Sequence, residues 1–146
     1  MDKNNHKYKA KQISRELLGL ELDQAETKYA IEQIKMQAID FTCGAYRFII
    51  DTSIDQILAD ELQDDLYILG CFNVDFISSQ TRLPYEMIEA CQKAEAFEAI
   101  GKGIIATCGI QKFAKAYQEA DGYGNHFAHY DHETIELLNY LVFRVN

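Results

Sequence analysis

The sequence contains no apolar run long enough to cross a bilayer, which requires about 20 consecutive apolar residues. Residues 1–20 are polar and basic, so they lack the apolar core of a signal peptide. These two absences predict a cytoplasmic protein with no membrane partner. The length of 146 residues favours one domain, which we expect over residues 10–146 after a flexible polar arm at residues 1–9.

The cysteines stand singly, with no CxxC pair and no short spacing of the kind that metal ligands show. In a reducing compartment, isolated cysteines are usually small buried hydrophobic residues. Their positions are Cys43, Cys71, Cys91 and Cys108.

Motifs for phosphate binding and for a serine nucleophile are also missing. The chain has no GxxxxGK[ST], GxGxxG or GxSxG, and the segment DELQDD lacks the alternating ligands and turn glycine of an EF-hand loop. We therefore expect no cofactor, no metal and no catalytic residue.

Positive charge is scarce outside the N-terminal segment. The formal net charge is −9; residues 1–20 hold five basic and two acidic side chains, so they carry +3 and the remaining 126 residues carry −12. Such a body repels nucleic acid, because duplex binding needs cations that replace condensed counterions. An acidic surface can attract proteins with basic, DNA-gripping clefts; alternatively, the acidity only keeps the protein in solution.

The most acidic stretch is residues 51–65, which contain six carboxylates and no Lys or Arg. Apolar residues interleave with them at helix-like spacing, which predicts a short helix or an amphipathic loop. A solvated helix face is one interpretation, and a partner-binding surface is the other. The candidate contacts are Asp55, Asp60, Glu61, Asp64 and Asp65.

Hydrophobic periodicity changes between helical and strand spacing along the chain. Helices are predicted over residues 11–21, 25–41, 82–93, 94–119 and 132–145. Strands are predicted over residues 45–51, 66–72 and 74–78. A loop is expected at residues 120–130 because of its glycines. Asp23 is expected to cap the second helix, with Glu26 completing a capping box.

The stretch DFTCGAYRF, residues 40–48, places Cys43 between a predicted helix and a predicted strand, with Gly44 ending the helix. Tyr46, Phe48 and Ile50 then share one strand face. Cysteine catalysis needs a thiolate and a base. The negative end of a helix disfavours a thiolate, and any base would have to come from residues 126–132. We interpret the stretch as a structural corner.

Three glycines, Gly101, Gly103 and Gly109, interrupt the apolar segment 94–119. Each costs a helix about 1 kcal/mol relative to alanine. Their presence predicts that another backbone closely approaches this central helix.

The alternative site is the segment HFAHYDH, in which His126, His129 and His132 are spaced by three residues. An irregular loop could bring three imidazoles to Zn²⁺ or Ni²⁺. A helix could not easily do so, because residues six apart are rotated by about 240°. With Cys43 or Cys108, this site would indicate a small metal-binding protein or hydrolase.

The order of motifs from residue 13 to 142 resembles the ArdB/KlcA antirestriction family of plasmids and phages. In that family an aromatic-x-Gly-Gly pattern precedes a strand with alternating aromatics, a later helix carries glycine and cysteine, and a His–Tyr pair opens the last helix. The matching positions are Phe41, Gly44, Tyr46, Phe48, Gly103, Cys108, Phe113, His129 and Tyr130. Cys43 replaces the first glycine of the family pattern, and Tyr46 replaces its tryptophan.

The resemblance implies an α+β fold with a small antiparallel sheet of about three to four strands, packed with about five helices. It also implies a non-enzymatic inhibitor from a mobile element that counters host type I restriction or a related DNA-based defence complex. The partner would be that complex, contacted through the acidic residues, with no direct binding of nucleic acid.

Overall fold

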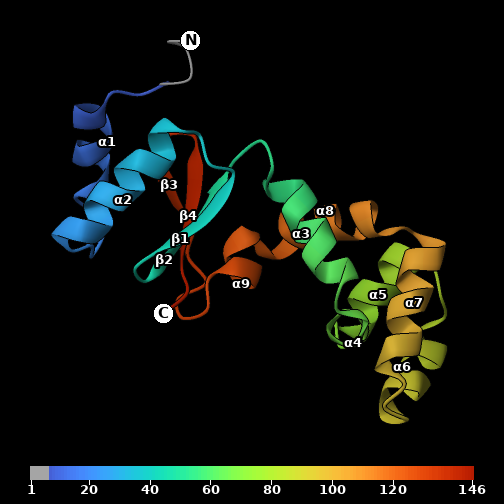
Figure 1. The fold of residues 1–146 in the computed structure, drawn as a ribbon. Coiled ribbons are helices and arrows are strands. Elements are labelled where there is room, and N and C mark those ends of the chain that lie inside the picture. Colours follow the sequence, from blue (N-terminus) through green and yellow to red (C-terminus); the bar gives the residue numbers. More distant parts are fainter. Residues whose placement is uncertain (1–6) are drawn as a thin grey trace. The chain divides into compact units, whose positions relative to one another are not determined.

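The computed structural model describes residues 7–146, and the chain divides into two compact units. The first unit combines Met1–Ile54 with Gly122–Asn146, and the second is Asp55–Asp121. The described residues form the expected α+β fold, with nine helices where about five were predicted and one four-stranded antiparallel sheet (Figure 1). The single domain over residues 10–146 stays a prediction, because two groups of contacts can still unfold as one cooperative unit.

The sheet of the first unit is built from two hairpins that are far apart in the sequence (Figure 1). β1 (Asp40–Cys43) pairs with β2 (Tyr46–Ile50), and β3 (Ile135–Leu137) pairs with β4 (Tyr140–Arg144). The strand order is β1-β2-β4-β3, so β2 and β4 join the hairpins in the middle of the sheet. The strand predicted over residues 45–51 is thereby confirmed as β2.

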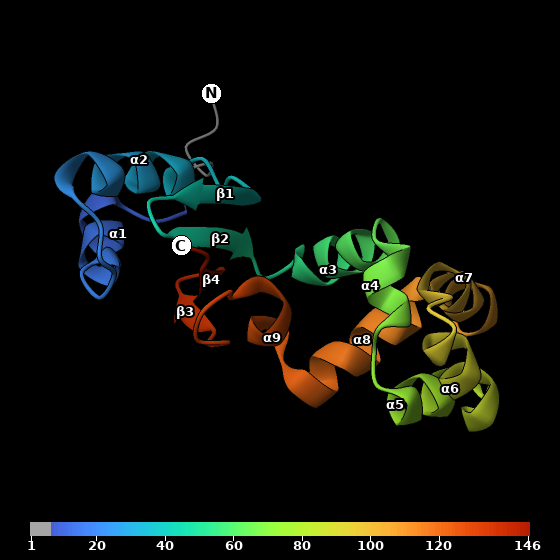
Figure 2. The ribbon, with the colours of Figure 1, turned by 90° about the horizontal axis from the view of Figure 1, so that it is seen from below.

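Two helices cover one face of this sheet, and a short helix lies on the other (Figure 2). These are α1 (Ala10–Leu17) and α2 (Gln24–Lys35) on one face and α9 (Tyr123–Phe127) on the other. The predicted capping box starts α2: the Asp23 carboxylate accepts from the Glu26 N–H at 2.7 Å, and the Glu26 carboxylate accepts from the Asp23 N–H at 2.9 Å.

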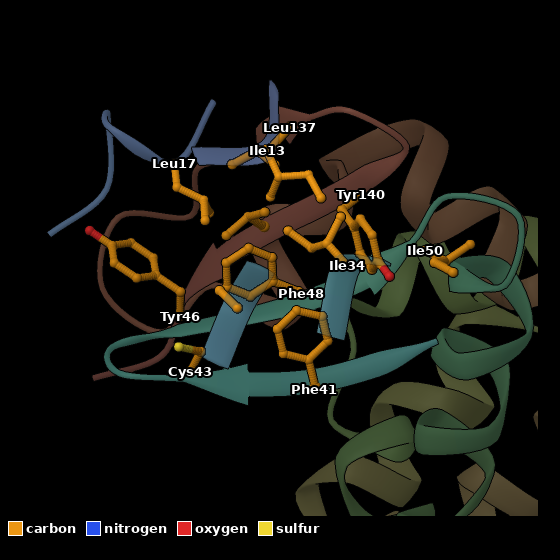
Figure 3. Close-up of a cluster of buried hydrophobic side chains, with 12 residues drawn as sticks. Ile13, Leu17, Ile34, Phe41, Cys43, Tyr46, Phe48, Ile50, Leu137 and Tyr140 are labelled. Atoms are coloured by element: carbon orange, nitrogen blue, oxygen red, sulfur yellow. The ribbon is translucent and has the colours of Figure 1, made fainter. Parts of the chain in front are cut away.

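The core of the first unit is an aromatic cluster between the sheet and the pair α1 and α2 (Figure 3). The Phe41 and Phe48 rings stack with 4.6 Å between their centroids, and the Tyr140 ring packs edge-on against both. Tyr46, Phe48 and Ile50 share the buried face of β2, as the predicted alternation requires.

On the opposite face of the sheet, the guanidinium of Arg47 lies over an aromatic ring of α9. The Phe127 ring packs 5.1 Å from the Phe143 ring, and the Arg47 guanidinium lies 5.1 Å from the centroid of Phe127. The Asp40 carboxylate accepts two hydrogen bonds from the same guanidinium, at 2.7 and 3.0 Å. This bidentate contact fixes the guanidinium plane above the ring.

Tyr140 connects the sheet to the segment between α2 and β1. Its hydroxyl donates to the Ala38 carbonyl at 2.7 Å, and burial, followed by the nearby Tyr8, raises the pKa of Tyr140 to about 12. Most of the arm expected at residues 1–9 lies outside the described residues, whereas Tyr8 packs partly buried against the core.

The helix predicted over residues 25–41 is too long, and residues 40–48 form a hairpin instead of a helix-to-strand corner. The chain leaves the helix where Gln37 adopts a left-handed conformation, with φ of 55°. Phe41 faces the core from β1, and its spacing from the preceding apolar residues suits a helix equally well. Gly44, with φ of 59°, lies in the hairpin turn, where a side chain would strain the backbone.

The helix predicted over residues 132–145 is also wrong, since these residues form the hairpin of β3 and β4. Tyr140 and Val142 enter the core at strand spacing, and Leu138 turns the chain with φ of 56°. The loop expected at residues 120–130 contains α9.

The second unit consists of helices. These are α3 (Ile54–Gln63), α4 (Leu66–Gly70), α5 (Val74–Thr81), α6 (Tyr85–Lys93), α7 (Phe97–Thr107) and α8 (Ile110–Asp121). The first residue of α3, Ile54, still belongs to the first unit. The strands predicted at residues 66–72 and 74–78 are wrong. Asp65 and Asn73 explain the error, because their side chains accept hydrogen bonds from backbone N–H groups three residues later and so start α4 and α5.

The helix predicted over residues 94–119 is two helices, α7 and α8. They separate at Gly109, which has φ of 84° and so ends α7 in a conformation that other residues resist.

The predicted close approach of another backbone is confirmed for Gly101, where α4 and α7 cross (Figure 2), but not for Gly103 or Gly109. A Cβ added at Gly101 of α7 would overlap the Leu66 carbonyl of α4. A Cβ added at Gly70 of α4 would overlap the Phe97 carbonyl of α7. Each helix therefore contributes one glycine against the backbone of the other.

We expect Gly101→Ala to lower the free energy of unfolding by about 1–3 kcal/mol or more, because its Cβ has no space beside Leu66. Gly103→Ala is the matched control in the same helix, since a Cβ there would lie 3.7 Å from Leu83 Cδ1. The control should raise stability by about 0.5–1 kcal/mol through helix propensity. Urea unfolding measures both variants, and equal effects would show that the crossing tolerates a side chain.

The raised pKa of Tyr140 predicts a pH-dependent contribution to stability. The folded state holds the hydroxyl proton more tightly than the unfolded state, whose value is near 10.0. The contribution is therefore complete below pH 10 and is lost as the pH rises towards 12. We expect the difference in unfolding free energy between the parent protein and Tyr140→Phe to shrink over this range. A constant difference would contradict the assignment.

Candidate protein-binding surface

The predicted acidic residues lie on α3 and on the turn that follows it. We call Asp55, Asp60, Glu61, Asp64 and Asp65 the acidic surface. The buried side of α3 is formed by Ile54, Leu58 and Leu62. The four aspartates are exposed and Glu61 is partly exposed, so the helix separates apolar and acidic side chains as its spacing predicted.

Two of these carboxylates also support local structure. Asp65 accepts a hydrogen bond from the Ile68 N–H at 3.1 Å and thereby caps α4. Asp60 accepts from the Gln56 side-chain amide at 2.8 Å, one helical turn earlier. Neither contact buries the carboxylate, so both side chains still present negative charge to solvent.

The charge of the chain is concentrated in the unit that carries this surface. Residues 55–121 contain twelve Asp and Glu against five Lys and Arg, which gives −7 of the total −9. Asp55 differs from the other four members, because it shares a groove of about 300 Å³ between α3 and α8 with Lys115. Lys115 therefore weakens the negative potential at Asp55.

Large apolar side chains lie exposed immediately beyond the acidic surface. Tyr67 and Ile68 on α4 are 52% and 48% exposed, and Cys71 at the end of this helix is also exposed. Sequence reasoning missed this group because residues 66–72 were predicted as a strand. The available signal was Asp65, an N-cap residue placed three positions before Ile68.

Cys43 has the surroundings of a packing residue. It is buried beneath α2, and its thiol donates to the Glu26 carbonyl at 3.1 Å. Burial, then the negative charges of Glu26 and Asp23, raise the pKa of Cys43. The thiolate is thus disfavoured by desolvation and nearby carboxylates, and not by a helix C-terminus as the sequence suggested.

The histidines considered as an alternative site have separate surroundings in the first unit. The His126 ring packs edge-on against Phe127, with 4.7 Å between centroids. His129 Nδ1 lies 3.2 Å from the Val145 carbonyl oxygen, and the carbonyl of His132 lies against Gly124. Across residues 7–146, no group of three or more His, Cys, Asp or Glu side chains could hold a metal ion.

Cys108, the other thiol considered with the histidines, belongs to the second unit, between α7 and α8. It is partly buried, and its thiol lies 3.5 Å from the Ile104 carbonyl. Burial raises the pKa of Cys108, and Lys112 opposes that shift. These contacts suit a packing residue more than a nucleophile.

Among the described residues, no helix combines the length and apolar composition that spanning a bilayer requires. Comparisons with family models, curated proteins and solved structures find no match for this chain. The resemblance to the ArdB/KlcA family therefore stays a prediction from motif order.

The thiols should differ strongly in reactivity. We expect iodoacetamide to alkylate Cys71 first in the folded protein, because it is exposed, and Cys43 last, because it is 3% exposed and its pKa is raised. Peptide mass spectrometry over a time course measures each rate. Alkylation of Cys43 as fast as Cys71, in protein that remains folded, would show a reactive thiol in the first unit.

Proposed function

We propose that this protein is a non-enzymatic binding protein of a mobile element that inhibits a DNA-processing complex of the host. The target class is a type I restriction system or a related DNA-based defence complex. The observation that carries the proposal is the acidic surface, five carboxylates within residues 55–65 uninterrupted by Lys or Arg. The resemblance to antirestriction proteins adds the biological setting.

The physical basis is electrostatic complementarity. Proteins that grip DNA hold Lys and Arg in clefts that neutralise phosphates. A surface with concentrated carboxylates is attracted to such a cleft and can compete with DNA for it. The main effect of this attraction is a faster rate of association between the two proteins. The affinity should therefore fall as salt rises.

The helical backbone fixes the positions at which these charged side chains are attached. α3 holds the carboxylates on a helix whose other side is buried, through Leu58 and Leu62. Asp65 is fixed by its hydrogen bond to the start of α4. Charges held in this way lose less conformational freedom on binding than charges on a loop.

The direct test is protection of unmodified DNA. A strain with a type I restriction system, with and without the protein, is transformed with unmodified plasmid, and an isogenic strain without restriction corrects for uptake. We expect the parent protein to raise recovery only in the restricting strain. The triple variant D55K/D60K/D64K, which leaves the cap residue Asp65 in place, should lose at least about tenfold of that protection, or about 1.4 kcal/mol of binding.

The matched control is E86K/E95K/E119K. It makes the same change in net charge within the second unit, at exposed positions outside residues 55–65. Each triple variant includes one first-turn acid, Asp55 of α3 or Glu86 of α6, so the helix-dipole cost is comparable. Protection retained by the acidic-surface variant, or lost equally in the control, would remove this surface from the mechanism.

A further inference from the structure

We propose that the exposed side of α4, Tyr67 with Ile68, is the apolar anchor of the interface, and that the partner is a protein with an apolar pocket ringed by Lys and Arg. This inference rests on the proposed function and deepens it, because it identifies a second recognition element and the chemistry that fits it. We call Tyr67 and Ile68 the α4 anchor.

The first observation is exposure. Tyr67 and Ile68 are 52% and 48% exposed although they are adjacent and both large. Solitary exposed apolar residues are ordinary, whereas contiguous exposed apolar surface marks interaction sites. Unlike the exposed pair Tyr85 and Met87 on α6, this pair directly follows Asp64 and Asp65 of the acidic surface. Tyrosine is also among the residues that carry most of the binding energy at protein interfaces.

The second observation is that several contacts hold α4 in place although it is very short. A helix of five residues has no stability of its own. Its start is capped by Asp65, and its body is pressed against α7 through Gly70 and Gly101. At its end, the Gln92 side-chain amide donates to the Gly70 carbonyl at 2.9 Å and to the Phe72 carbonyl at 2.8 Å.

The anchor side chain is itself positioned. The Tyr67 ring packs on the ring of Phe97 from α7, with 4.9 Å between centroids. The phenol therefore has a packing partner on α7, the partly buried Phe97, although about half of the Tyr67 side chain stays exposed. A partner that covers it loses little side-chain entropy, which is the condition for a strong anchor.

Charge identifies the occupant. The α4 anchor directly follows Asp64 and Asp65, and the unit carries −7. A second copy of this chain that presented the same surface would bring the same charge to the contact and be repelled. An anionic membrane surface or a nucleic acid would be repelled as well. A protein with basic residues around an apolar pocket satisfies both the charge and the exposed side chains.

The test measures binding of the full-length protein to a purified type I restriction complex by surface plasmon resonance. We expect Y67S/I68S to weaken binding at least tenfold while the dependence of affinity on salt stays unchanged, because no charge is removed. The control Y85S/M87S removes the same kind of pair from α6, where Tyr85 and Met87 are 40% and 45% exposed. The control should bind within twofold of the parent protein.

A second readout locates the contact without a substitution in the anchor. Cys71 is exposed at the end of α4, so bound complex should slow its alkylation by iodoacetamide at least fivefold. Circular dichroism melting confirms that each variant is folded. Unprotected Cys71 in a saturated complex would overturn the proposal even if Y67S/I68S failed to fold.

The outcomes separate the two proposals. If the parent protein binds, D55K/D60K/D64K loses binding and Y67S/I68S retains it, the α4 anchor is wrong and the proposed function stands. If only Y67S/I68S loses binding, the anchor stands without the acidic surface. If the parent protein does not bind the complex, both proposals fail. Two further results would contradict the proposed partner of the α4 anchor. They are self-association in sedimentation, or pelleting with phosphatidylserine vesicles, if the Y67S/I68S variant abolishes it.

Discussion

The crossing of α4 and α7 is the constraint on which the second unit depends. Gly70 and Gly101 each let a carbonyl of the opposite helix come closer than any side chain would allow. This contact places the two helix backbones directly against each other. A shift of one helix along the other would bring side chains into the space that the glycines leave. The five-residue α4 is positioned by this contact together with the Asp65 cap and the Gln92 hydrogen bonds. The positions of the exposed Tyr67 and of the turn with Asp64 and Asp65 depend on it in turn.

The first unit is organised by a different principle, the stacking of aromatic rings across strands. Phe41 and Phe48 stack within the first hairpin, and Tyr140 from the second hairpin closes the cluster. The other face of the sheet uses a mixed contact, with Arg47 clamped by Asp40 above Phe127. The stretch that contains Cys43 thus has a structural role in a sheet, where its thiol is buried and protonation is favoured.

The parts of the fold that depend on local chemistry could be predicted from the sequence. Three such features involve only residues that are close together in the sequence. They are the capping box of Asp23 and Glu26, the alternation along β2 and the amphipathic spacing of α3. The close approach at Gly101 was also predictable, because a glycine destabilises a helix and is therefore expected where a side chain would not fit.

The errors arose where one pattern fits two structures. Phe41 and Tyr140 lie in segments whose apolar spacing suited a helix, and strand pairing decided against it. Phe41 pairs with Phe48 in the next strand, and Tyr140 pairs with Ile50 far along the chain. Residues 66–72 were predicted as a strand, yet the Asp65 cap and the glycine crossing favour the helix Leu66–Gly70. The acidic residues of the candidate surface were found because exposure of charge is a local property. The α4 anchor was missed because exposure of Tyr67 and Ile68 depends on which side of a helix meets α7.

The sheet of the first unit also sets an order of events during synthesis. Ile50 pairs with Tyr140, so strand β2 waits while about ninety further residues leave the ribosome. Its central edge is open throughout that interval, a state prone to pairing with the wrong strand. The helices of residues 55–121 find their partners within that unit, so they can assemble before the second hairpin is made. The nascent protein therefore displays its finished acidic half while its other half still lacks a completing hairpin.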